Sequence, residues 1–506
     1  MSRKIGVVLS YVLMIFEVLS TLLLTPFIIR TLGQAEYGVY KLVVAVNAYL
    51  LLLDLGVGNA IIRYIAKYKV SGERERERQF LAVATIYYAV IALIALAAGG
   101  VLIAVFPTTF AKGLSPQEIS LGQTLLAITM FNSAVTLGTA TYNNILIAYE
   151  RFAVSRITSI FQIVVRMILT YAVLVVGWGS VGIVTVNLLT TVLCRGFFVG
   201  YVLIQLKLRP LFRGIDFTFI KEITAYSSFI LLQMIATQIN STVDQLLIGS
   251  LVEASAVILA VYGVGTQIVQ YFQSIGAAFT GVLMPGVVKL VERNASPKEL
   301  TDEMIRIGRI IFMVLAVIWC GFAVFGQEFI VLWAGKENAD AYIVATILMS
   351  AYIVILTESM GPQVLWAMNQ HKEQSILKII IVMLNIALTV VLIKWNPLIG
   401  ATIGTFISLM LGDVGVMNLI FKKKLNIKLS YYYKGIFKGI VQCMLLAIIF
   451  GIAIRHVFPS GWIWLIIKLS MIVCIYGAAM LAYGMTKYEK ELVLSILRKL
   501  RIIGGR

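Results

Sequence analysis

The sequence predicts an all-α protein that crosses a membrane many times, and three observations support this class. Of the 506 residues, 60% are apolar and only 13% are charged, whereas an average soluble chain carries about 25% charged residues. Apolar runs of roughly 20 residues recur along the whole length, and each is long enough to span a hydrocarbon core of ~30 Å. Basic residues gather in alternate gaps between these runs, which is typical of multi-span membrane proteins.

The apolar runs predict about 14 transmembrane helices, numbered here as spans in chain order. Their expected ranges are 9–29, 41–62, 80–106, 119–146, 154–176, 180–204, 227–249, 257–285, 309–333, 341–367, 375–394, 398–421, 436–455 and 461–483. Two six-helix lobes followed by two further helices account for this number.

The gaps between the spans predict the division into lobes. The longest cytoplasmic gap follows six spans and precedes six more, so we interpret it as the link between the lobes. Along the chain we expect an N-lobe at 1–206, a cytoplasmic linker at 207–226, a C-lobe at 227–421, the extra spans within 422–485 and an amphipathic cytoplasmic tail at 486–506. The tail places apolar residues at helical spacing opposite basic ones, which favours a helix on the membrane surface.

The charges of the gaps predict the orientation. The even-numbered gaps hold Arg63, Lys67, Lys69, Arg74, Arg76, Arg78, Arg151, Lys207, Arg209, Arg213, Lys289, Arg293, Lys298, Lys422, Lys423, Lys424 and Lys428, and the odd-numbered gaps hold almost no basic residues. The positive-inside rule then places both termini in the cytoplasm. The net charge of +18 is therefore an orientation signal, and no nucleic-acid partner is expected. The alternating Glu and Arg residues of 73–78 are expected to form a solvated loop or helix extension.

The sequence lacks the motifs that indicate nucleotide binding, zinc binding or nucleophilic catalysis. It has no Walker loop, no dinucleotide fingerprint, no zinc-ligand spacing and no nucleophile elbow. The four cysteines fall within predicted spans without a pairing pattern, as core residues do. We therefore expect no enzyme, no metal and no cofactor. Any work must come from an ion gradient, of protons or sodium, or from the downhill flux of a substrate.

Polar stripes run along four of the predicted spans. Span 5 carries Ser155, Ser159, Gln162 and Arg166 at intervals of 4, 3 and 4 residues, which is one helical face. The other stripes are Asn132, Thr136, Thr139 and Asn143 in span 4, Gln233, Thr237, Asn240 and Asp244 in span 7, and Thr266, Gln270 and Gln273 in span 8. Such groups are costly against lipid, so the stripes face each other or water. Hydrogen bonding between helices explains single residues, whereas continuous stripes with a charge favour a hydrated central cavity.

Further ionisable residues lie at membrane depth, where charges are functional by default. They are Arg195 in span 6, Glu17 in span 1, Asp54 in span 2, Glu358 in span 10 and Asp413 in span 12. Arg30 and Arg63 lie near span ends, where their side chains can reach the interface. Gly361 and Pro362, just after Glu358, are expected to break span 10.

The stretch 25–69 resembles the polysaccharide-transporter branch of the multidrug/oligosaccharidyl-lipid/polysaccharide (MOP) exporter superfamily, the Wzx-like flippases. The resemblance rests on "RTLGQAEYGVY", from Arg30 to Tyr40, and on "LDLG" followed by "RY", from Leu53 to Tyr64. It extends to the number of spans and the two-lobe organisation along the chain. It implies a MATE/MOP-like, V-shaped, alternating-access transporter.

The resemblance also implies a substrate and roles for site residues. The substrate would be an undecaprenyl-diphosphate-linked oligosaccharide, moved from the inner to the outer leaflet for O-antigen, capsule or exopolysaccharide assembly. Arg166 and Arg195 would bind the diphosphate, since arginine forks onto phosphate oxygens, with Arg30 and Arg63 as guides. Gln162, Asn240 and Gln270 would bind sugar hydroxyls. Candidates for ion coupling are Asp54, Asp244, Glu17 and Glu358, and the lipid tail would pass an opening between spans 1 and 8.

The expected partners are the polyprenyl-linked glycan, membrane lipids and the polysaccharide polymerase machinery, with the transporter itself a monomer. Two alternatives stay open at this point. A lipid II flippase also has fourteen spans, although its arginines cluster in spans 1 and 2, whereas span 1 here carries Glu17. A cation-coupled multidrug antiporter of the same superfamily would have twelve spans and an apolar, acidic cavity. A polymerase or ligase would need a large outer loop, and the longest outer loop here has roughly a dozen residues.

Overall fold

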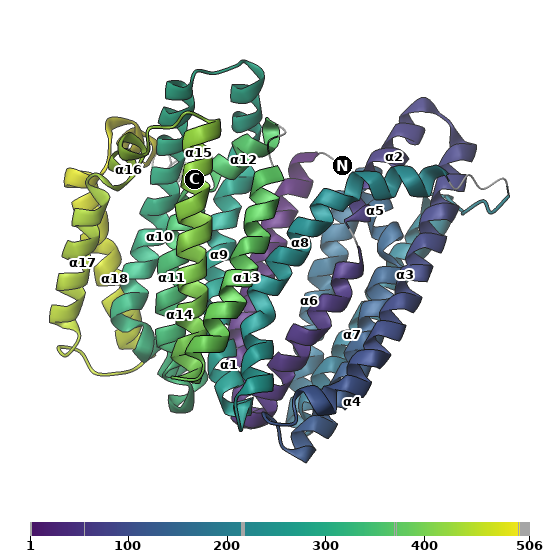
Figure 1. The fold of residues 1–506 in the computed structure, drawn as a ribbon, viewed down its shortest axis with the longest axis horizontal. Helices are drawn as coiled ribbons and strands as arrows, with labels where there is room; N and C mark the ends of the chain where they lie inside the picture. The colour runs from purple at the N-terminus through teal and green to yellow at the C-terminus, as the bar shows by residue number, and fades with distance from the viewer. Residues whose placement is uncertain are drawn as a thin grey trace, which may run out of the picture. The chain divides into compact units, whose positions relative to one another are not determined.

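The computed structural model describes residues 3–54, 56–213, 218–368, 370, 372–493 and 495, and these residues form helices joined by turns and loops, without strands (Figure 1). The all-α membrane class is thus confirmed. Ten helices in this part of the chain are long and apolar enough to cross a membrane, or up to twelve if each of two bent pairs is one span. The number 14 is not confirmed, in part because one such stretch, Leu9–Ser71, covers both of the first two predicted spans.

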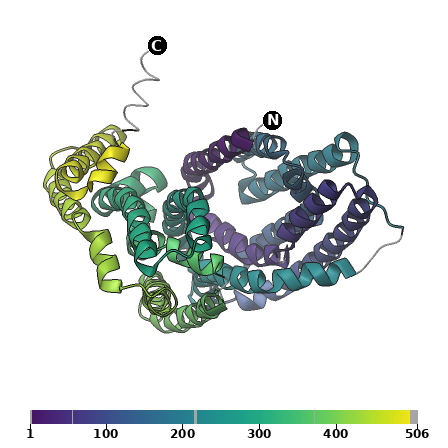
Figure 2. The same ribbon diagram turned by 90° about the horizontal axis from the view of Figure 1, so that it is seen from above.

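The chain divides into two compact units, Met1–Ala260 and Val261–Arg506. The division falls inside a helix, so the predicted boundaries of the lobes and of the linker stay a prediction. Most of the predicted tail, 486–506, lies outside the described residues. In Figure 2 many helices of the second unit, coloured teal to green, are seen close to end-on, which shows that they run side by side.

Among its described residues, the first unit contains eight α-helices and the start of a ninth. They are α1 (Arg3–Leu51), α2 (Val57–Ser71), α3 (Arg74–Thr109), α4 (Pro116–Gly138), α5 (Ala140–Ala148), α6 (Phe152–Val175), α7 (Gly179–Gly200), α8 (Thr218–Leu251) and α9 (Ser255–Glu292). Helix α4 packs against α3, α1 and α7, and α6 packs against α1 and α7.

Two predicted spans of this unit are interrupted within the apolar stretch. Span 2 passes from the end of α1 through a short 3-10 turn, Leu52–Asp54, into α2, and Gly56 before α2 has φ 71°. Span 4 is divided between α4 and α5 at Thr139. Interrupted helices at membrane depth are tolerated where protein or a water-lined cavity satisfies the freed backbone groups. Both interruptions therefore point to the interior of this unit.

The "RTLGQAEYGVY" motif has a packing role. Gly33 has φ 75°, so α1 consists of two helical segments that meet at this residue. Glu36 Oε1 accepts a hydrogen bond of 2.6 Å from the backbone N–H of Ser180, next to the start of α7. A Cβ on Gly38 would lie 1.8 Å from the carbonyl oxygen of Ala256 in α9. The motif thus ties α1 to α7 and to the start of α9.

The acidic and basic residues at the start of α3 are more ordered than a solvated loop would be. The Glu77 side chain is 1% exposed, and it accepts hydrogen bonds from Tyr149 Oη at 2.5 Å and from Arg74 at 3.1 Å. Arg74 also donates to the carbonyl of Leu206 at 3.0 Å, and Arg78 donates to that of Arg209 at 2.9 Å. The predicted helix extension is present, because α3 begins at Arg74, but Glu77 is not solvated, since its carboxylate is buried among fixed donors.

The second unit contains the rest of α9 and the remaining helices. They are α10 (Pro297–Ala334), α11 (Ala341–Thr357), α12 (Met360–Ala367), α13 (Lys372–Leu392), α14 (Pro397–Leu409), α15 (Met417–Lys424), α16 (Leu429–Phe437), α17 (Ile440–Ile454) and α18 (Trp462–Ala479). Helices α11 and α12 meet at a bend of 43°. The predicted break is present, but it precedes Gly361 and Pro362, which lie in the first turn of α12, where proline is tolerated.

A buried arginine joins the C-terminal helices to α10. Arg309, 5% exposed, pairs with Glu489 at 2.7 Å and donates to the backbone carbonyls of Gly435, Lys438 and Gly484 at 2.8–2.9 Å. These carbonyls lie at the end of α16 and at the end of the π-helical turn Met480–Gly484, which continues α18, and helical hydrogen bonds run out at such ends. Arg309 therefore satisfies groups that would otherwise be buried without partners.

Candidate functional site

A polar cavity of about 450 Å³ lies within the first unit, at the two interrupted spans. Its volume is in the range of small-molecule sites. Span 2, span 4, α7 and α8 supply its lining, which consists of Leu51, Asp54, Gly56, Gly58, Asn59, Ile62, Thr136, Leu137, Ala140, Asn143, Asn144, Ile147, Arg195 and Met234.

Asp54 and Arg195 provide the charges of this cavity. Asp54 lies in the turn between α1 and α2, because Gly56 with its positive φ ends one helical segment and starts the next. Its Oδ1 accepts a hydrogen bond of 2.5 Å from Tyr88 Oη of α3. Arg195 of α7 is close enough to interact electrostatically with Asp54. The cavity thus combines a guanidinium with a carboxylate that is held by a neighbouring helix.

Two amides of the cavity, Asn143 and Asn144, come from α5, and a third, Asn59, comes from α2. Asn143 Oδ1 accepts a hydrogen bond of 3.1 Å from Ser155 Oγ of α6, so part of the amide remains available for other groups. Gly58 allows α2 to approach α5 closely, because a Cβ there would lie 2.8 Å from Asn144 Nδ2. Thr136 precedes the break of span 4, and Asn143 follows it. The predicted polar stripe of span 4 therefore contributes two residues to one cavity.

A row of exposed polar side chains leads from the cavity along α2. Asn59, which lines the cavity, is followed at intervals of four residues by Arg63 and Lys67, and all three are exposed. Residues at this spacing share one helical face. Arg63 is thus next to the cavity lining on this face, whereas Arg30, also exposed, lies on the first segment of α1.

Arg166 has surroundings different from those of Arg195. It is half-buried on α6, and it interacts electrostatically with Tyr40 of α1. Among the described residues Arg166 lines neither the polar cavity nor the second cavity. Gln162, one turn earlier, lines the second cavity and donates a long hydrogen bond of 3.5 Å to Thr191. Gln162 thus lines a cavity that Arg166 does not line, and the prediction that the stripe of span 5 faces a hydrated central cavity stays a prediction.

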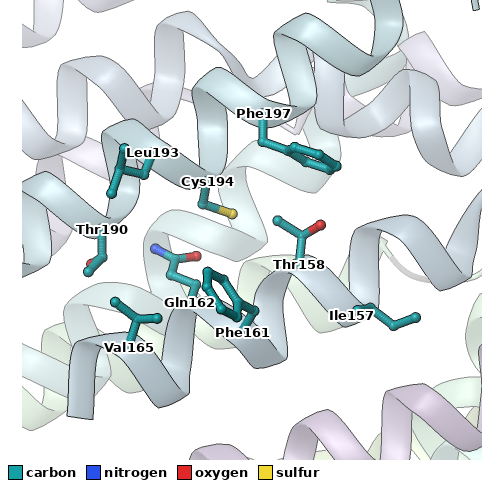
Figure 3. A pocket seen from close by; sticks show the side chains of 9 residues that line it. All are labelled: Ile157, Thr158, Phe161, Gln162, Val165, Thr190, Leu193, Cys194 and Phe197. Carbon is teal, nitrogen blue, oxygen red and sulfur yellow. The ribbon is translucent and has the colours of Figure 1, made fainter. Parts of the chain in front are cut away.

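The second cavity, of about 340 Å³, lies between α6 and α7 and is largely apolar (Figure 3). Ile157, Thr158, Phe161, Gln162 and Val165 of α6 line it, together with Thr190, Leu193, Cys194 and Phe197 of α7. Phe161 and Leu193 are 67% and 69% exposed. Such exposure of large apolar side chains is expected where a helix faces lipid.

The other predicted site residues are not among those that line the polar cavity. Glu17 is exposed on the first segment of α1. Asp244 is 3% exposed on α8, and Asn240 lies one turn earlier. Gln270 is exposed on α9, where its Oε1 accepts a hydrogen bond of 3.4 Å from Gln267. The side chain of Gln233 lies outside the described residues.

Glu358 belongs to a buried cluster in the second unit. It is 3% exposed at the bend between α11 and α12. Its carboxylate accepts hydrogen bonds from Tyr433 Oη and, at 3.2 Å, from Asn418 Nδ2. Asp413 in the same unit pairs with Lys378 at 2.6 Å. These donors satisfy the Glu358 carboxylate from within the protein, which is what a buried carboxylate requires.

Sequence reasoning missed Tyr88, Asn59 and Asn144. A tyrosine in an apolar span has no periodic signal, and only the fold brings Tyr88 to Asp54. Asn144 follows the predicted stripe residue Asn143 directly. It lines the same cavity because the interruption at Thr139 makes α5 a separate helical segment.

Comparison with known structures identifies the class of fold. "Lipid II flippase MurJ, inward closed conformation" is 14% identical, with a TM-score of 0.73 over 97% of this chain and 100% of that chain. "Inward-facing conformation of a multidrug resistance MATE family transporter of the MOP superfamily" is 15% identical, with a TM-score of 0.63 over 80% of this chain and 96% of that chain. At this identity the likeness shows the fold, which is that of the MOP-superfamily transporters.

The family follows from the sequence itself. The model of the family described as "Polysaccharide biosynthesis protein" matches residues 6–291. The chain therefore belongs to this polysaccharide biosynthesis family, as its resemblance to Wzx-like transporters indicated. A comparison with curated protein sequences finds no match.

Proposed function

We propose that this protein is a flippase that moves a polyprenyl-diphosphate-linked oligosaccharide across the cytoplasmic membrane for surface polysaccharide assembly. The observation that carries the proposal is the polar cavity of about 450 Å³ at the two interrupted spans, with Arg195 in its lining. A cationic group beside helix interruptions at membrane depth is typical of transporter substrate sites. Membership of a polysaccharide biosynthesis family supports a glycan as cargo.

The lining suits the two polar parts of such a substrate. Arg195 donates to diphosphate oxygens through its planar fork, and Arg63 and Lys67 on the exposed face of α2 guide the anion from the cytoplasmic side. Asn59, Asn143 and Asn144 carry amides that both donate and accept, as sugar hydroxyls do. Arg166, near Tyr40, contacts the diphosphate at a different stage of transport from Arg195.

In this proposal, carboxylates couple substrate transport to a gradient of protons or sodium ions. Asp54 lies beside Arg195, so protonation of Asp54 or binding of sodium to it changes the charge that the diphosphate meets. Asp244, Glu17 and Glu358 remain candidates for the same role. The protein works as a monomer without a cofactor, has both termini in the cytoplasm of a bacterial or archaeal cell, and delivers its product to a polysaccharide polymerase.

The test is deletion of the gene in its native host, followed by mass spectrometry of diphosphate-linked glycans with leaflet-specific labelling. We expect them to accumulate in the inner leaflet and to be cleared by wild type or by Arg293→Gln, a matched control in an exposed loop. Arg195→Gln should reduce transport roughly tenfold to a hundredfold, because a hydrogen bond to a charged group contributes about 1.5–3 kcal/mol and each 1.4 kcal/mol is tenfold. Arg166→Gln should also reduce transport.

Two other outcomes would contradict this proposal. Accumulation of a peptide-bearing peptidoglycan precursor would assign the protein to lipid II transport. A normal distribution of all lipid-linked glycans, with altered efflux of small cationic dyes, would assign it to multidrug antiport. Equal rescue by Arg195→Gln and Arg293→Gln would remove Arg195 from the substrate site.

A further inference from the structure

The apolar cavity between α6 and α7 is a groove on the outside of the first unit. Figure 3 shows Phe161 and Gln162 of α6 and Cys194 of α7 on opposite sides of the space that they line. An ordinary lipid-facing surface is only slightly concave, whereas this groove encloses about 340 Å³, which is enough to bury part of a chain-like ligand. Phe161, Leu193 and Phe197 form its apolar walls, and the less exposed Cys194 and Thr190 lie deeper.

The groove and the polar cavity share α7, and α6 of the groove also contacts a residue of the polar cavity. Cys194 lines the groove, and the next residue, Arg195, lines the polar cavity. On α6, Thr158 lines the groove, and Ser155, about one turn earlier, donates a hydrogen bond of 3.1 Å to Asn143 of the polar cavity. The two sites therefore lie on different faces of α7, one largely apolar and the other charged.

We propose that the α6–α7 groove binds the first isoprene units of the substrate's polyprenyl chain while the diphosphate is at Arg195. The proposal rests on the proposed function and adds a site for the lipid part of the substrate. The occupant is the isoprenoid chain rather than a phospholipid acyl chain, because only the substrate carries a chain joined to a head group that the neighbouring cavity suits. Its methyl branches pack against Phe161, Leu193 and Phe197. This site differs from the opening between spans 1 and 8 that the resemblance implies.

The test uses the purified full chain in lipid nanodiscs and a polyprenyl diphosphate with a diazirine near the diphosphate. After illumination, peptide mass spectrometry should locate adducts in 157–165 and 190–197. Unlabelled polyprenyl diphosphate should suppress them, and excess phosphatidylethanolamine should not. Equal labelling of these segments by a diazirine phospholipid, without such competition, would show ordinary surrounding lipid and overturn the proposal. Adducts confined to α1 and α9 would also overturn it.

A pair of tryptophan variants tests the groove itself. Leu193→Trp fills the groove from an exposed position, whereas Ile168→Trp adds the same bulk at a similarly exposed position of α6 outside it, the two residues being 69% and 59% exposed. The quantity measured is the concentration of unlabelled polyprenyl diphosphate that halves the labelling. We expect Leu193→Trp to raise this concentration by on the order of tenfold, which corresponds to about 1.4 kcal/mol. Ile168→Trp should leave it unchanged. Equal effects of the two variants would contradict the assignment.

Arg195→Gln separates failure of this inference from failure of the proposed function. If Arg195→Gln weakens the labelling and Leu193→Trp leaves it unchanged, Arg195 is retained as the head-group site and the groove is rejected as the site of the isoprenoid chain. Labelling that neither variant changes, together with normal glycan distribution after gene deletion, would reject the proposed function as well.

Discussion

Single residues hold the polar cavity in shape, and Tyr88 is the clearest case. Its hydroxyl donates to Asp54 at 2.5 Å, and it does so from a different helix. The contact fixes the carboxylate beside Arg195 and the interruption of span 2. Tyr88 thus positions a charge that the proposed transport cycle uses, without itself lining the cavity.

Tyr88→Phe removes this hydrogen bond and keeps the ring. We expect the free energy of unfolding to fall by about 1.5–3 kcal/mol, because the acceptor is a carboxylate, and this is measured as a lower thermal midpoint in detergent. Asp54→Asn should cost a similar amount, and the double variant should cost less than the sum of the two. Additive costs would show that the two side chains do not act as a pair.

Glu489 gives the protein a pH-dependent contact outside the predicted spans. Burial alone would raise its pKa, but hydrogen bonds from Arg309 and from the Thr486 backbone outweigh burial and hold the pKa below its ordinary value. A carboxyl group with a depressed pKa stabilises the fold above its unfolded pKa, and this stabilisation is lost as the pH falls through the folded pKa.

We therefore expect wild type to lose stability at acidic pH in part through this pair. Glu489→Gln should be less stable at neutral pH, by roughly 3–5 kcal/mol if Arg309 remains buried without a counter-charge. Its loss of stability below about pH 4.3 should be smaller than that of wild type. Parallel thermal-midpoint profiles of the two proteins against pH would contradict this role.

At the scale of secondary-structure elements, the interruption of span 2 decides which of its residues line the polar cavity. Span 2 could have been one continuous helix by apolar content, yet its interruption brings Asp54, Gly56 and Asn59 into the cavity lining. Gly56 makes the interruption possible, because its φ of 71° lies in the left-handed region that favours glycine.

Gly56→Ala should destabilise the protein by about 1–2 kcal/mol, since a Cβ is strained in this conformation. Gly100→Ala, in the interior of α3 with nothing within 4 Å of the added Cβ, should be neutral or slightly stabilising. Thermal unfolding of the two variants and a transport measurement provide the comparison. Equal stability of Gly56→Ala and Gly100→Ala would contradict a requirement for the left-handed conformation at residue 56.

At the scale of the whole molecule, close backbone approaches join segments that are far apart in the sequence. Besides the Gly38 contact with Ala256, the backbone N–H of Ser255 donates to the carbonyl of Gly113 at 2.7 Å, and a Cβ on Gly113 would lie 2.0 Å from the carbonyl of Gly249. These contacts hold the loop between α3 and α4, the second segment of α1 and the loop between α8 and α9 together.

Gly38→Ala should loosen this contact region, because its Cβ would meet a backbone atom that cannot turn away. We expect a loss of roughly 1–3 kcal/mol and greater accessibility of a cysteine introduced at Ala254 to a membrane-impermeant thiol reagent. Gly196→Ala, where an added Cβ has open space, is the control. If Gly38→Ala leaves the accessibility of the cysteine at position 254 unchanged, the contact between Gly38 and Ala256 has no role in packing these segments together.

The sequence by itself determined the class of the protein and much of its family. Apolar runs and alternating charge are local properties, so they predict membrane helices without a fold, and "RTLGQAEYGVY" and "LDLG" indicated the polysaccharide-transporter branch. The stripe of span 4 predicted two cavity residues, Thr136 and Asn143, because helical periodicity fixes which side chains share a face.

Only the tertiary structure decided which of these faces meet. Arg166 and Arg195 are both arginines within apolar spans, but just Arg195 lines the polar cavity, since the rotation of α6 and α7 about their axes depends on packing against α1 and α4. Gln162 points into the apolar groove instead, and Glu77 is buried because Tyr149 and Arg74 surround it. Contacts between residues distant in sequence leave no period in the sequence, so no local pattern could have predicted them.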